Sequence, residues 1–246
     1  MITAQLFTQP ETSVTNYMAH TNTPTMRFNT EAQLVSLFEG IVGHKIDKNS
    51  SGLISELECG DGIADLALYE LHKGWKNSLI LGEIPPRWVY ALRNLPYRKN
   101  FTTTDFISRT NVTRNTTLQM LNHYVELGFC VKKDKYDTWA KIKQPRPLVN
   151  RIIAVEAKLK HWQRALTQAV RYRDYANQSW VLLDEYSVRP AIKNIQQFKR
   201  LNIGLAALST SGNITTYMLP QLLKPKSTLR FWQANSEIAR RLISPL

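Results

Sequence analysis

The feature that most constrains this chain is a short apolar run that ends in two charged residues. Ile152–Val155 form the run, and Glu156, Ala157 and Lys158 follow it directly. An apolar run of this length predicts a buried strand. Alternate residues of an extended chain point to the same side, so Glu156 and Lys158 project together from the end of that strand. We therefore expect a sheet that buries the run and presents a carboxylate beside an ammonium group.

The charged pair has two interpretations. A carboxylate can hold a divalent cation, and a neighbouring ammonium group can orient water or offset the charge of a phosphate. The alternative is a solvated ion pair, which contributes little to stability and has no chemical role. The rest of the chain has to decide between these two interpretations.

A second unusual carboxylate, Asp65, lies in a predicted hairpin. Ser51–Cys59 and Ile63–Tyr69 alternate apolar and polar residues, as strands do, and Gly60, Asp61 and Gly62 form a turn between them. In the second strand Asp65 shares a face with apolar side chains. A buried aspartate needs a cation or several hydrogen bonds. The alternative is an aspartate near the turn that caps nearby backbone amides.

Charge is unevenly distributed along the 246 residues, whose net charge is +13. Residues 31–83 carry nine acidic and four basic side chains, whereas 84–151 carry four and thirteen, and 152–246 carry five and fourteen. An acidic segment within a basic chain suits a cation site on a surface that binds a polyanion. The alternative is a generally basic protein whose acidic residues cluster by chance.

The middle of the chain has the pattern of a separate, inserted domain. Pro85 and Pro86 precede it, and Pro145 and Pro147 follow it. We expect helices at Arg87–Asn94, Thr102–Ser108 and Thr113–Leu127, with Gly128 ending the third helix, and strands at Phe129–Lys133 and Thr138–Lys143. This order resembles a winged helix-turn-helix domain of about sixty residues.

The winged-helix resemblance implies a DNA-binding surface. The residues that would contact DNA from the third helix are Thr113, Arg114, Asn115, Thr117 and Gln119, and those that would meet phosphates from the wing are Lys132, Lys133 and Lys135. Winged helices also serve as protein-binding modules, which is the alternative. The local excess of nine positive charges favours DNA.

The chain after the insert predicts further helices and strands. A helix at Leu159–Ala176 would place Lys160, Arg164, Gln168 and Arg171 on one face and Trp162, Leu166, Ala169 and Val170 on the other. We expect strands at Trp180–Leu183, Ile203–Leu208 and Ile214–Met218, and helices at Ala191–Arg200 and Thr228–Ile243. Before the insert, Glu31–Val42 predicts an amphipathic helix with Thr30 as its N-cap.

Without the insert, the predicted order is helix, strand, strand, strand, helix, strand. Asp65 lies on the second strand, Glu156–Lys158 on the third, and Gln168–Tyr172 on the helix that follows. This arrangement resembles the PD-(D/E)xK nuclease superfamily, and the Gln-Ala-x-x-Tyr run is similar to the extra motif of its RecB-like branch. The chain departs from the pattern in having no proline before Asp65 and in the ninety-one positions between Asp65 and Glu156, which the insert accounts for.

The resemblance implies an α/β (α+β) fold of the restriction-endonuclease-like type, with a mixed central sheet flanked by helices. The implied domains are a discontinuous nuclease-like core at 30–83 and 149–246, an inserted winged helix at 84–148, and a flexible N-terminal lead-in at 1–29.

The resemblance also implies roles for individual residues. Asp65 and Glu156, with the Ala157 carbonyl, would bind Mg²⁺ or Mn²⁺. Lys158 would position the attacking water, and Gln168 would orient the site or contact the phosphate. Glu39 is a further candidate ligand, in an outer shell. Lys160, Arg164 and Arg171 would contact DNA beside the site.

The expected function is that of a metal-dependent DNA endonuclease that a winged helix targets to DNA, in restriction, defence or recombination. Two alternatives stay open: a DNA-binding regulator that does not cleave, and a nuclease subunit active only with a partner, in a homodimer or a larger complex. No membrane span or secretory signal is expected. The two cysteines, Cys59 and Cys130, fit a reduced cytoplasmic protein associated with the nucleoid.

Overall fold

The computed structural model describes residues 7, 27–133 and 137–244, and the chain divides into two compact units. Unit 1 comprises Met1–Leu71 and Val149–Phe231, and unit 2 comprises His72–Leu148 and Trp232–Leu246. This division differs from the one expected from the sequence, because residues 72–83 and the end of the chain belong with the inserted segment. Most of the lead-in expected at 1–29 lies outside the described residues.

Unit 1 is built on a six-stranded mixed sheet. Its strands are β1 (Ser51–Cys59), β2 (Gly62–Leu71), β6 (Val149–Lys158), β7 (Gln178–Asp184), β8 (Gly204–Leu208) and β9 (Ile214–Met218), in the order β1-β2-β6-β7-β8-β9. Strands β6, β7 and β8 run parallel, and the other neighbours are antiparallel. Each strand forms where the sequence predicts one, although β6 is longer than its apolar run and includes Glu156–Lys158.

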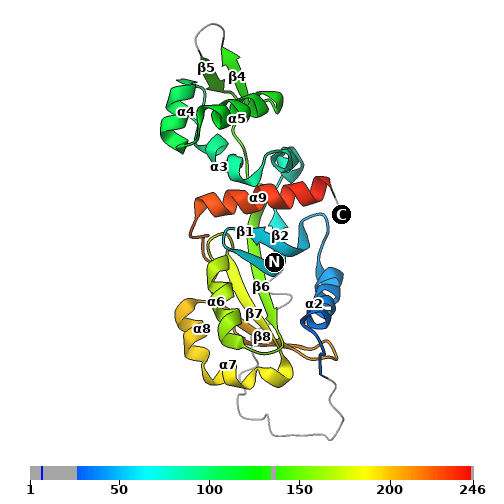
Figure 1. Ribbon diagram of the computed structural model, residues 1–246. Coiled ribbons are helices and arrows are strands. Elements are labelled where there is room, and N and C mark those ends of the chain that lie inside the picture. Colours follow the sequence, from blue (N-terminus) through cyan, green and yellow to red (C-terminus); the bar gives the residue numbers. More distant parts are fainter. Residues whose placement is uncertain (1–6, 8–26, 134–136, 245–246) are drawn as a thin grey trace, which may run out of the picture. The chain divides into compact units, whose positions relative to one another are not determined.

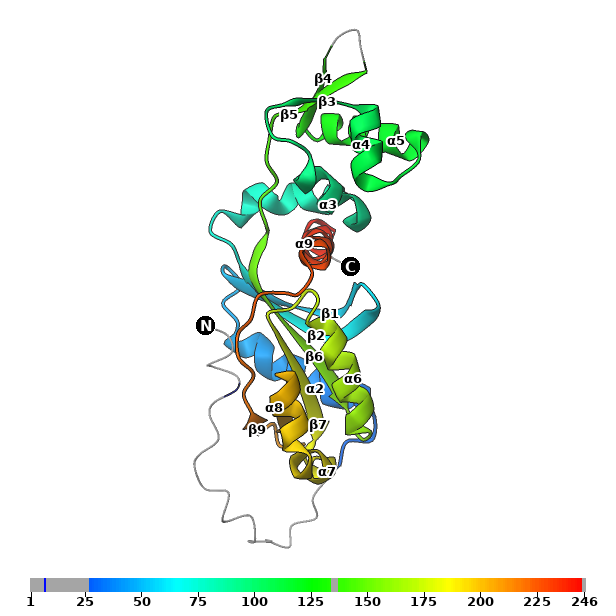
Figure 2. The ribbon, with the colours of Figure 1, turned by 90° about the vertical axis from the view of Figure 1, so that its left-hand side faces the viewer.

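Helices cover both faces of this sheet (Figures 1 and 2). They are α2 (Glu31–Lys45) on one face and α6 (Trp162–Tyr172) and α8 (Ile195–Leu201) on the other, with α7 (Arg189–Lys193) leading into α8. Helix α2 starts where the sequence predicts, because the Thr30 side chain accepts a hydrogen bond from the Gln33 amide. Its buried face, Leu34, Phe38 and Val42, packs on the core.

The alternation of β2 and β6 sorts their side chains between the two helical layers. Leu66, Leu68, Ile153, Val155 and Ala157 point into the core that α2 covers. The alternate residues, among them Asp65 and Glu156, therefore face the α6 side. Thus the pattern that buries the apolar run also directs the acidic side chains toward one helix.

Two predicted helices of unit 1 have different bounds in the structure. Helix α6 begins at Trp162, because His161 has φ of 61° and cannot continue a right-handed helix, so Lys160 is not part of α6. The helix predicted at Ala191–Arg200 is broken into α7 and α8 at Asn194, whose φ and ψ are −111° and 22°.

Unit 2 combines helices with a small three-stranded sheet. Its elements are the 3-10 helix η1 (Trp75–Glu83), α3 (Pro86–Asn94), β3 (Asn100–Thr102), α4 (Thr103–Thr110), α5 (Arg114–Glu126), β4 (Cys130–Lys133) and β5 (Thr138–Lys141). The strands are ordered β3-β5-β4 and pair antiparallel. The sequence predicted these elements except η1 and β3.

Local signals explain where the helices of unit 2 begin and end. Thr102 and Asp105 form a capping box at the start of α4, with bonds of 2.8 and 3.1 Å between side chain and backbone. Gly128 follows α5 with φ of 71°, the conformation that lets a glycine end a helix.

Helix α9 (Thr228–Ile243) supplies part of the core of unit 2 from Trp232 onward. The Asn235 side chain accepts a bond of 2.8 Å from the Leu148 amide, and the Ser236 hydroxyl donates one of 2.6 Å to the Ile84 carbonyl. The insert predicted at 84–148 is therefore completed by a helix from the other end of the chain.

Lys141, at the end of β5, is buried and binds the last turn of α3. Its Nζ donates to the carbonyls of Leu92 and Arg93 at 3.2 and 3.0 Å. Burial lowers the pKa of Lys141 to about 8. The ammonium group thus ties the three-stranded sheet to the carboxyl end of α3, where the helix dipole favours a cation.

Both units are mixtures of helix and strand, so the α+β class and the mixed, helix-flanked sheet are confirmed. None of the helices in the described ranges is both long and apolar enough to cross a membrane.

Candidate active site

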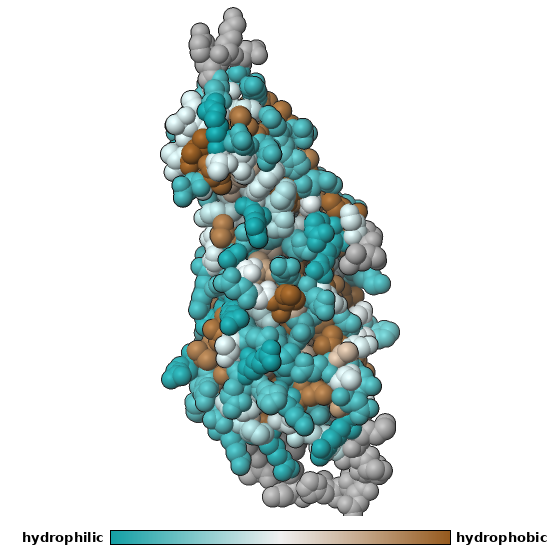
Figure 3. Space-filling view, viewed as in Figure 1, coloured by the Kyte–Doolittle hydropathy of each residue, from teal (hydrophilic) through white to brown (hydrophobic). Residues whose placement is uncertain are grey.

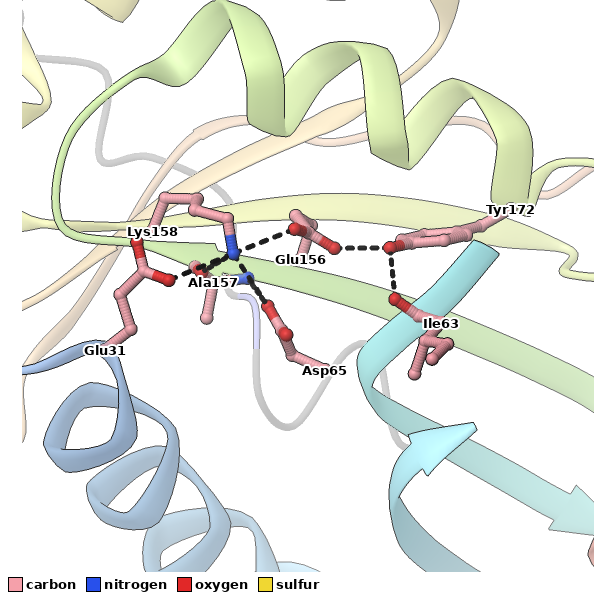
Figure 4. A network of polar contacts seen from close by, with 7 residues as sticks. All are labelled: Glu31, Ile63, Asp65, Glu156, Ala157, Lys158 and Tyr172. Atoms are coloured by element: carbon pink, nitrogen blue, oxygen red, sulfur yellow. Dashed lines mark hydrogen bonds and ion pairs between the residues drawn. The ribbon is translucent and has the colours of Figure 1, made fainter. Parts of the chain in front are cut away.

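Two neighbouring strands bring the predicted acidic residues together. Strands β2 and β6 pair with Leu66 opposite Val155, which places Asp65 beside Glu156. Lys158 follows on the same face of β6. Figure 4 shows Asp65 and Glu156 on either side of the Lys158 ammonium group, with Glu31 approaching from the first turn of α2. The expectation that Asp65, Glu156 and Lys158 converge is therefore met by their positions.

Lys158 lies at the centre of three carboxylates. Its Nζ is 3.0 Å from Glu156 Oε1, 3.1 Å from Glu31 Oε2 and 3.6 Å from Asp65 Oδ2, and it also donates to the Ala157 carbonyl at 3.0 Å. The Lys158 side chain is only 14% exposed. The pair predicted from the strand is thus not a solvated one, because a largely buried ammonium group holds three acids around it.

Asp65 is fixed by the backbone of the neighbouring strand. The Ala157 amide donates to Asp65 Oδ2 at 2.7 Å. Burial raises the pKa of Asp65, and Glu31 raises it further, while the Ala157 amide and Lys158 act against the rise. Asp65 therefore accepts an amide bond, as the capping alternative proposed, and also faces a cation.

Glu156 is fully buried and is held from the other side by Tyr172, the last residue of α6. The Tyr172 hydroxyl bonds Glu156 Oε2 and also lies 2.6 Å from the Ile63 carbonyl. A tyrosine hydroxyl has one hydrogen, and a carbonyl can only accept. Tyr172 can therefore satisfy both oxygens only when the Glu156 carboxyl supplies a second hydrogen.

Burial and neighbouring charges shift the pKa values of Glu156 and Lys158. Burial raises the pKa of Glu156, and the nearby Asp65 adds to the rise against the opposing bonds from Tyr172 and Lys158. Burial by itself would lower the pKa of Lys158, but Glu156, Asp65 and Glu31 together raise it above its usual value. The site therefore favours a charged lysine and a carboxyl that takes up a proton readily.

The strand next to Asp65 is strained at one position. Glu56 lies opposite Asp65 in β1 and has φ of 52°, a conformation that is unfavourable for glutamate. The burial of β1 changes phase there, from Ile54 to Leu57 and Cys59. Backbone strain of this kind clusters at functional sites, where the surrounding structure enforces it.

The donor atoms of the site suit a hard divalent cation. Among the described residues, no group of three or more histidine, cysteine, aspartate or glutamate side chains is arranged to hold a metal ion. The carboxylates of Glu31, Asp65 and Glu156 surround the Lys158 ammonium group instead. Carboxylate and carbonyl oxygens are what Mg²⁺ and Mn²⁺ prefer, so these residues fit such an ion, for which the ammonium group stands in.

The other residues predicted for the core site lie on α6 and in the loop before it. Gln168 is half-buried on α6, and its Oε1 finds no hydrogen-bond partner in the described chain. Arg164 and Arg171 are exposed on the same helix, and Arg171 donates to the Asp61 carbonyl at 3.5 Å. Lys160 is exposed in the loop before α6.

Glu39 does not belong to the cluster. Its carboxylate accepts a bond from the Ser55 hydroxyl. The acid that reaches Lys158 from α2 is Glu31, two turns earlier on the helix. Glu39 therefore lies outside the cluster in which it was expected, and Glu31 takes that place, because the first turn of α2, and not its third, lies at the end of β6.

Sequence reasoning missed the contributions of Glu31 and Tyr172. The sequence signals were the Thr30 cap, which fixes Glu31 in the first turn of a helix, and the tyrosine that ends the Gln-Ala-x-x-Tyr run. Neither signal shows which strand the side chain contacts, since Glu31 lies 127 positions from Lys158.

The candidate DNA contacts of unit 2 are partly exposed and partly not. The exposed side chains are those of Thr113, Arg114, Asn115, Gln119, Lys132 and Lys133. Thr113 also caps α5 by accepting a hydrogen bond from the Thr116 amide at 3.3 Å. Lys135 lies outside the described residues. Arg114 is 3.6 Å from Asp137, which follows the loop between β4 and β5.

The prediction that Thr117 contacts DNA is wrong. Its side chain is 0% exposed, so it cannot contact DNA from the surface of α5. The buried face of α5 is Thr117, Met120, Leu121 and Tyr124, which follows helical spacing. The apolar pattern of this segment predicts Leu118, Leu121 and Val125 for the buried face. Leu121 is buried, but Leu118 and Val125 are only half-buried.

Comparison of the chain with protein-family models, with curated proteins and with solved structures finds no match.

Proposed function

We propose that the chain is a metal-dependent DNA endonuclease of the PD-(D/E)xK type, which hydrolyses phosphodiester bonds with Asp65, Glu156 and Lys158. The observation that carries this proposal is the convergence of three carboxylates on Lys158 Nζ, at 3.0, 3.1 and 3.6 Å, at the end of a central strand. The order α2, β1, β2, β6, α6, β7 and the mixed sheet support the restriction-endonuclease-like fold.

The residues of the cluster have separable roles in this proposal. Asp65, Glu156 and the Ala157 carbonyl would hold Mg²⁺ or Mn²⁺, which would polarise a phosphoryl oxygen and lower the pKa of a bound water. Lys158 donates hydrogen bonds and positive charge at the attacked phosphate. Glu31 keeps Lys158 in place, and Tyr172 fixes the rotamer of Glu156. Arg164 and Arg171, exposed on α6, provide charge for the DNA backbone.

Unit 2 supports DNA targeting. Its three helices followed by a hairpin are in the order of a winged helix, and α5 and β4 expose Arg114, Asn115, Gln119, Lys132 and Lys133. In this proposal α5 enters the major groove by its first turns, and the strand lysines contact phosphates.

Cleavage of supercoiled and linear DNA tests the function. We expect nicked or linear product with Mg²⁺ or Mn²⁺, no product with EDTA, and loss of product in Asp65→Ala and Glu156→Ala. Glu39→Gln is the matched control, since Glu39 is a carboxylate of α2 that bonds Ser55 outside the cluster. Metal-independent product, or equal loss in Glu39→Gln, would reject the assignment.

A non-cleaving DNA-binding protein is the second candidate. The observation that favours it is the tight hold of the carboxylates on Lys158, which a divalent cation has to displace. The same assay separates the two functions, because such a protein would bind duplex DNA without converting it under any metal condition. A nuclease subunit that needs a partner would give product only in the presence of that partner.

A further inference from the structure

Unit 2 carries a second candidate surface, at the end of its small sheet where β5 ends at Lys141. Tyr97 is 43% exposed and Ile142 is 48% exposed, which is high for side chains of this size. A parallel bridge pairs Tyr97 with Lys141, the residue that precedes Ile142. Arg98, Lys99 and Lys143 adjoin them in sequence and are exposed. We call these five residues the Tyr97 patch.

The backbone holds the patch in a fixed arrangement. The Arg98 amide donates to the Lys141 carbonyl at 2.9 Å, and the Ile142 amide donates to the Phe129 carbonyl at 2.9 Å. Arg98 has φ of 55°, a left-handed turn that leads the chain away from Tyr97. The backbone that follows Tyr97 is therefore held to the end of β5 by the Arg98 amide.

The cations of the patch have no acidic partners. Among the residues that the structure describes, Arg98, Lys99 and Lys143 form no ion pair with a carboxylate. The Arg98 guanidinium lies 5.1 Å from the centre of the Tyr97 ring, and Lys143 Nζ lies 5.3 Å from that of Phe129. The patch therefore combines an exposed ring with positive charge that no described carboxylate of unit 2 neutralises.

The Tyr97 patch is separate from the surface proposed to read duplex DNA. Arg114, at the start of α5, is 3.6 Å from Asp137 and so lies at the loop end of β5. Ile142 is bonded to Phe129, just after the other end of α5. The 13 residues of α5 span about 20 Å at 1.5 Å per residue. A duplex seated on the first turns of α5 therefore leaves the patch uncovered.

We propose that the Tyr97 patch binds a single-stranded segment of nucleic acid, with one base stacked on Tyr97 and the backbone held by Arg98, Lys99 and Lys143. Exposed rings among cations are the means by which proteins hold single strands, because every base has a face that can stack and every nucleotide a phosphate. A duplex hides its base faces and would use the cations alone. On the one face of the molecule that Figure 3 draws, hydrophobic residues form small separate spots among polar ones.

The test measures binding to the full chain in EDTA, which prevents cleavage. The probe is a fluorescein-labelled oligothymidylate of about 20 nucleotides, and fluorescence anisotropy reports its affinity beside that of a duplex of equal length. We expect Tyr97→Ala to weaken oligothymidylate binding by roughly 10- to 100-fold and duplex binding by less than about twofold. Tyr97→Trp should bind as the wild type does, because stacking needs the ring and not the hydroxyl.

The charged residues give a second readout. Arg98→Ala with Lys143→Ala should lower the salt slope of oligothymidylate binding by about 0.7 for each phosphate that the variant no longer neutralises. Lys76→Ala, at an exposed lysine of η1, is the charge-matched control and should leave the slope unchanged. Bromodeoxyuridine in the oligonucleotide should crosslink to Tyr97 on irradiation, and mass spectrometry would locate the adduct.

Three results would overturn the proposal. One is oligothymidylate affinity in Tyr97→Ala equal to that of the wild type, which would leave the patch as a protein-docking surface. Another is an equal loss of affinity for duplex and single strand, which would make the patch part of the duplex site. The third is a crosslink only outside the patch. None of these bears on the nuclease proposal, since binding is measured without metal.

Discussion

The candidate active site consists of side chains that shift one another's pKa values. Lys158 is kept charged by three acids, and Glu156 is pushed toward its protonated form by burial. Tyr172 joins Glu156 to the Ile63 carbonyl, so the position of the glutamate depends on a residue outside the charged cluster. Removal of a single hydroxyl or a single charge should therefore have a measurable effect on cleavage rate, Mn²⁺ affinity or thermal stability.

Tyr172→Phe removes the hydroxyl while keeping the ring in the core. Because Glu156 then loses the partner that fixes its rotamer, we expect the cleavage rate to fall by about 10- to 100-fold and the affinity for Mn²⁺ to fall with it. Tyr175→Phe is the matched control, because the buried Tyr175 hydroxyl has no hydrogen-bond partner among the described residues. Equal rates in Tyr172→Phe and the wild type would show that Tyr172 only fills space.

Glu156→Gln should stabilise the protein at neutral pH while removing activity. The pKa of Glu156 is raised in the folded state, so its contribution to stability is present at acidic pH and is lost as the pH rises through that pKa. A neutral amide avoids this loss. We therefore expect the variant to unfold at a higher temperature than the wild type at pH ~7.5, by about 2–4 °C for each kcal/mol gained.

The gain in Glu156→Gln should shrink near pH ~5, where the wild-type carboxyl is also protonated. A lower melting temperature of the variant at neutral pH would mean that the charged pair with Lys158 outweighs the cost of burying Glu156.

At the scale of elements, close packing between backbones decides which substitutions the fold accepts. A Cβ on Gly82, in η1, would lie 2.6 Å from the Arg240 amide nitrogen and 2.7 Å from the Ala239 carbonyl carbon of α9. A Cβ on Gly40, in α2, would have nothing within 4 Å. Gly82 is therefore required for the packing of η1 on α9, whereas Gly40 only lowers the stability of α2.

Gly82→Ala should destabilise the protein and Gly40→Ala should stabilise it. We expect a loss of about 1–3 kcal/mol in the first, because backbone atoms of α9 cannot move aside freely. The second should gain about 0.5–1 kcal/mol from the higher helix propensity of alanine. Urea unfolding followed by circular dichroism measures both, and a neutral Gly82→Ala would show that η1 and α9 are not in close contact.

The sequence predicted the strands that carry the site because their patterns are local. The alternation of Ile63–Tyr69 placed Asp65 on one strand, and the apolar run before Glu156 placed Glu156 and Lys158 on another. That the two strands bring these residues together was implied only by the resemblance to the nuclease superfamily. The predictions that were wrong concern contacts between elements far apart in the sequence. Glu39 and Glu31 are both acids of one helix, and only the packing of α2 on the sheet selects Glu31.

The same limit explains the error on α5. Thr117 is polar, and the sequence alone favoured its apolar neighbour Leu118 for the buried face. The buried face of α5 is set by what the helix packs on, and it includes Thr117 in place of Leu118. The role of α9 in unit 2 was missed for a similar reason, because helical periodicity does not identify the unit that a terminal helix completes.

At the scale of the whole molecule, the chain has one acidic segment followed by basic ones. The segment 31–83 is acidic and contains Glu31 and Asp65, whereas 84–151 and 152–246 are basic. Lys132 and Lys133 are exposed on β4 and Arg114 on α5. Contacts to phosphates make the affinity depend on salt concentration but not on DNA sequence. Contacts to base edges make the affinity depend on sequence, so the two kinds of contact can be measured independently.

Lys132→Ala with Lys133→Ala should weaken binding to every duplex and lower the salt slope by about 0.9 for each phosphate that the double variant no longer neutralises. Arg114→Ala should weaken binding by about 1–3 kcal/mol at preferred sequences only. Lys48→Ala, at an exposed lysine of the acidic segment, is the control for charge. Salt-titrated anisotropy with several duplexes measures all three, and unchanged slopes in the double variant would exclude β4 from the DNA surface.

The most direct test is the rate at which Lys158→Ala converts supercoiled DNA in Mg²⁺, compared with Lys48→Ala. Lys158 is held by three carboxylates, whereas Lys48 is an exposed lysine after the end of α2. We predict a loss of at least about 100-fold in Lys158→Ala, with circular dichroism showing an intact fold, and a change of less than about threefold in Lys48→Ala. Conversion by a folded Lys158→Ala protein at the wild-type rate would contradict the assignment of this cluster as the active site.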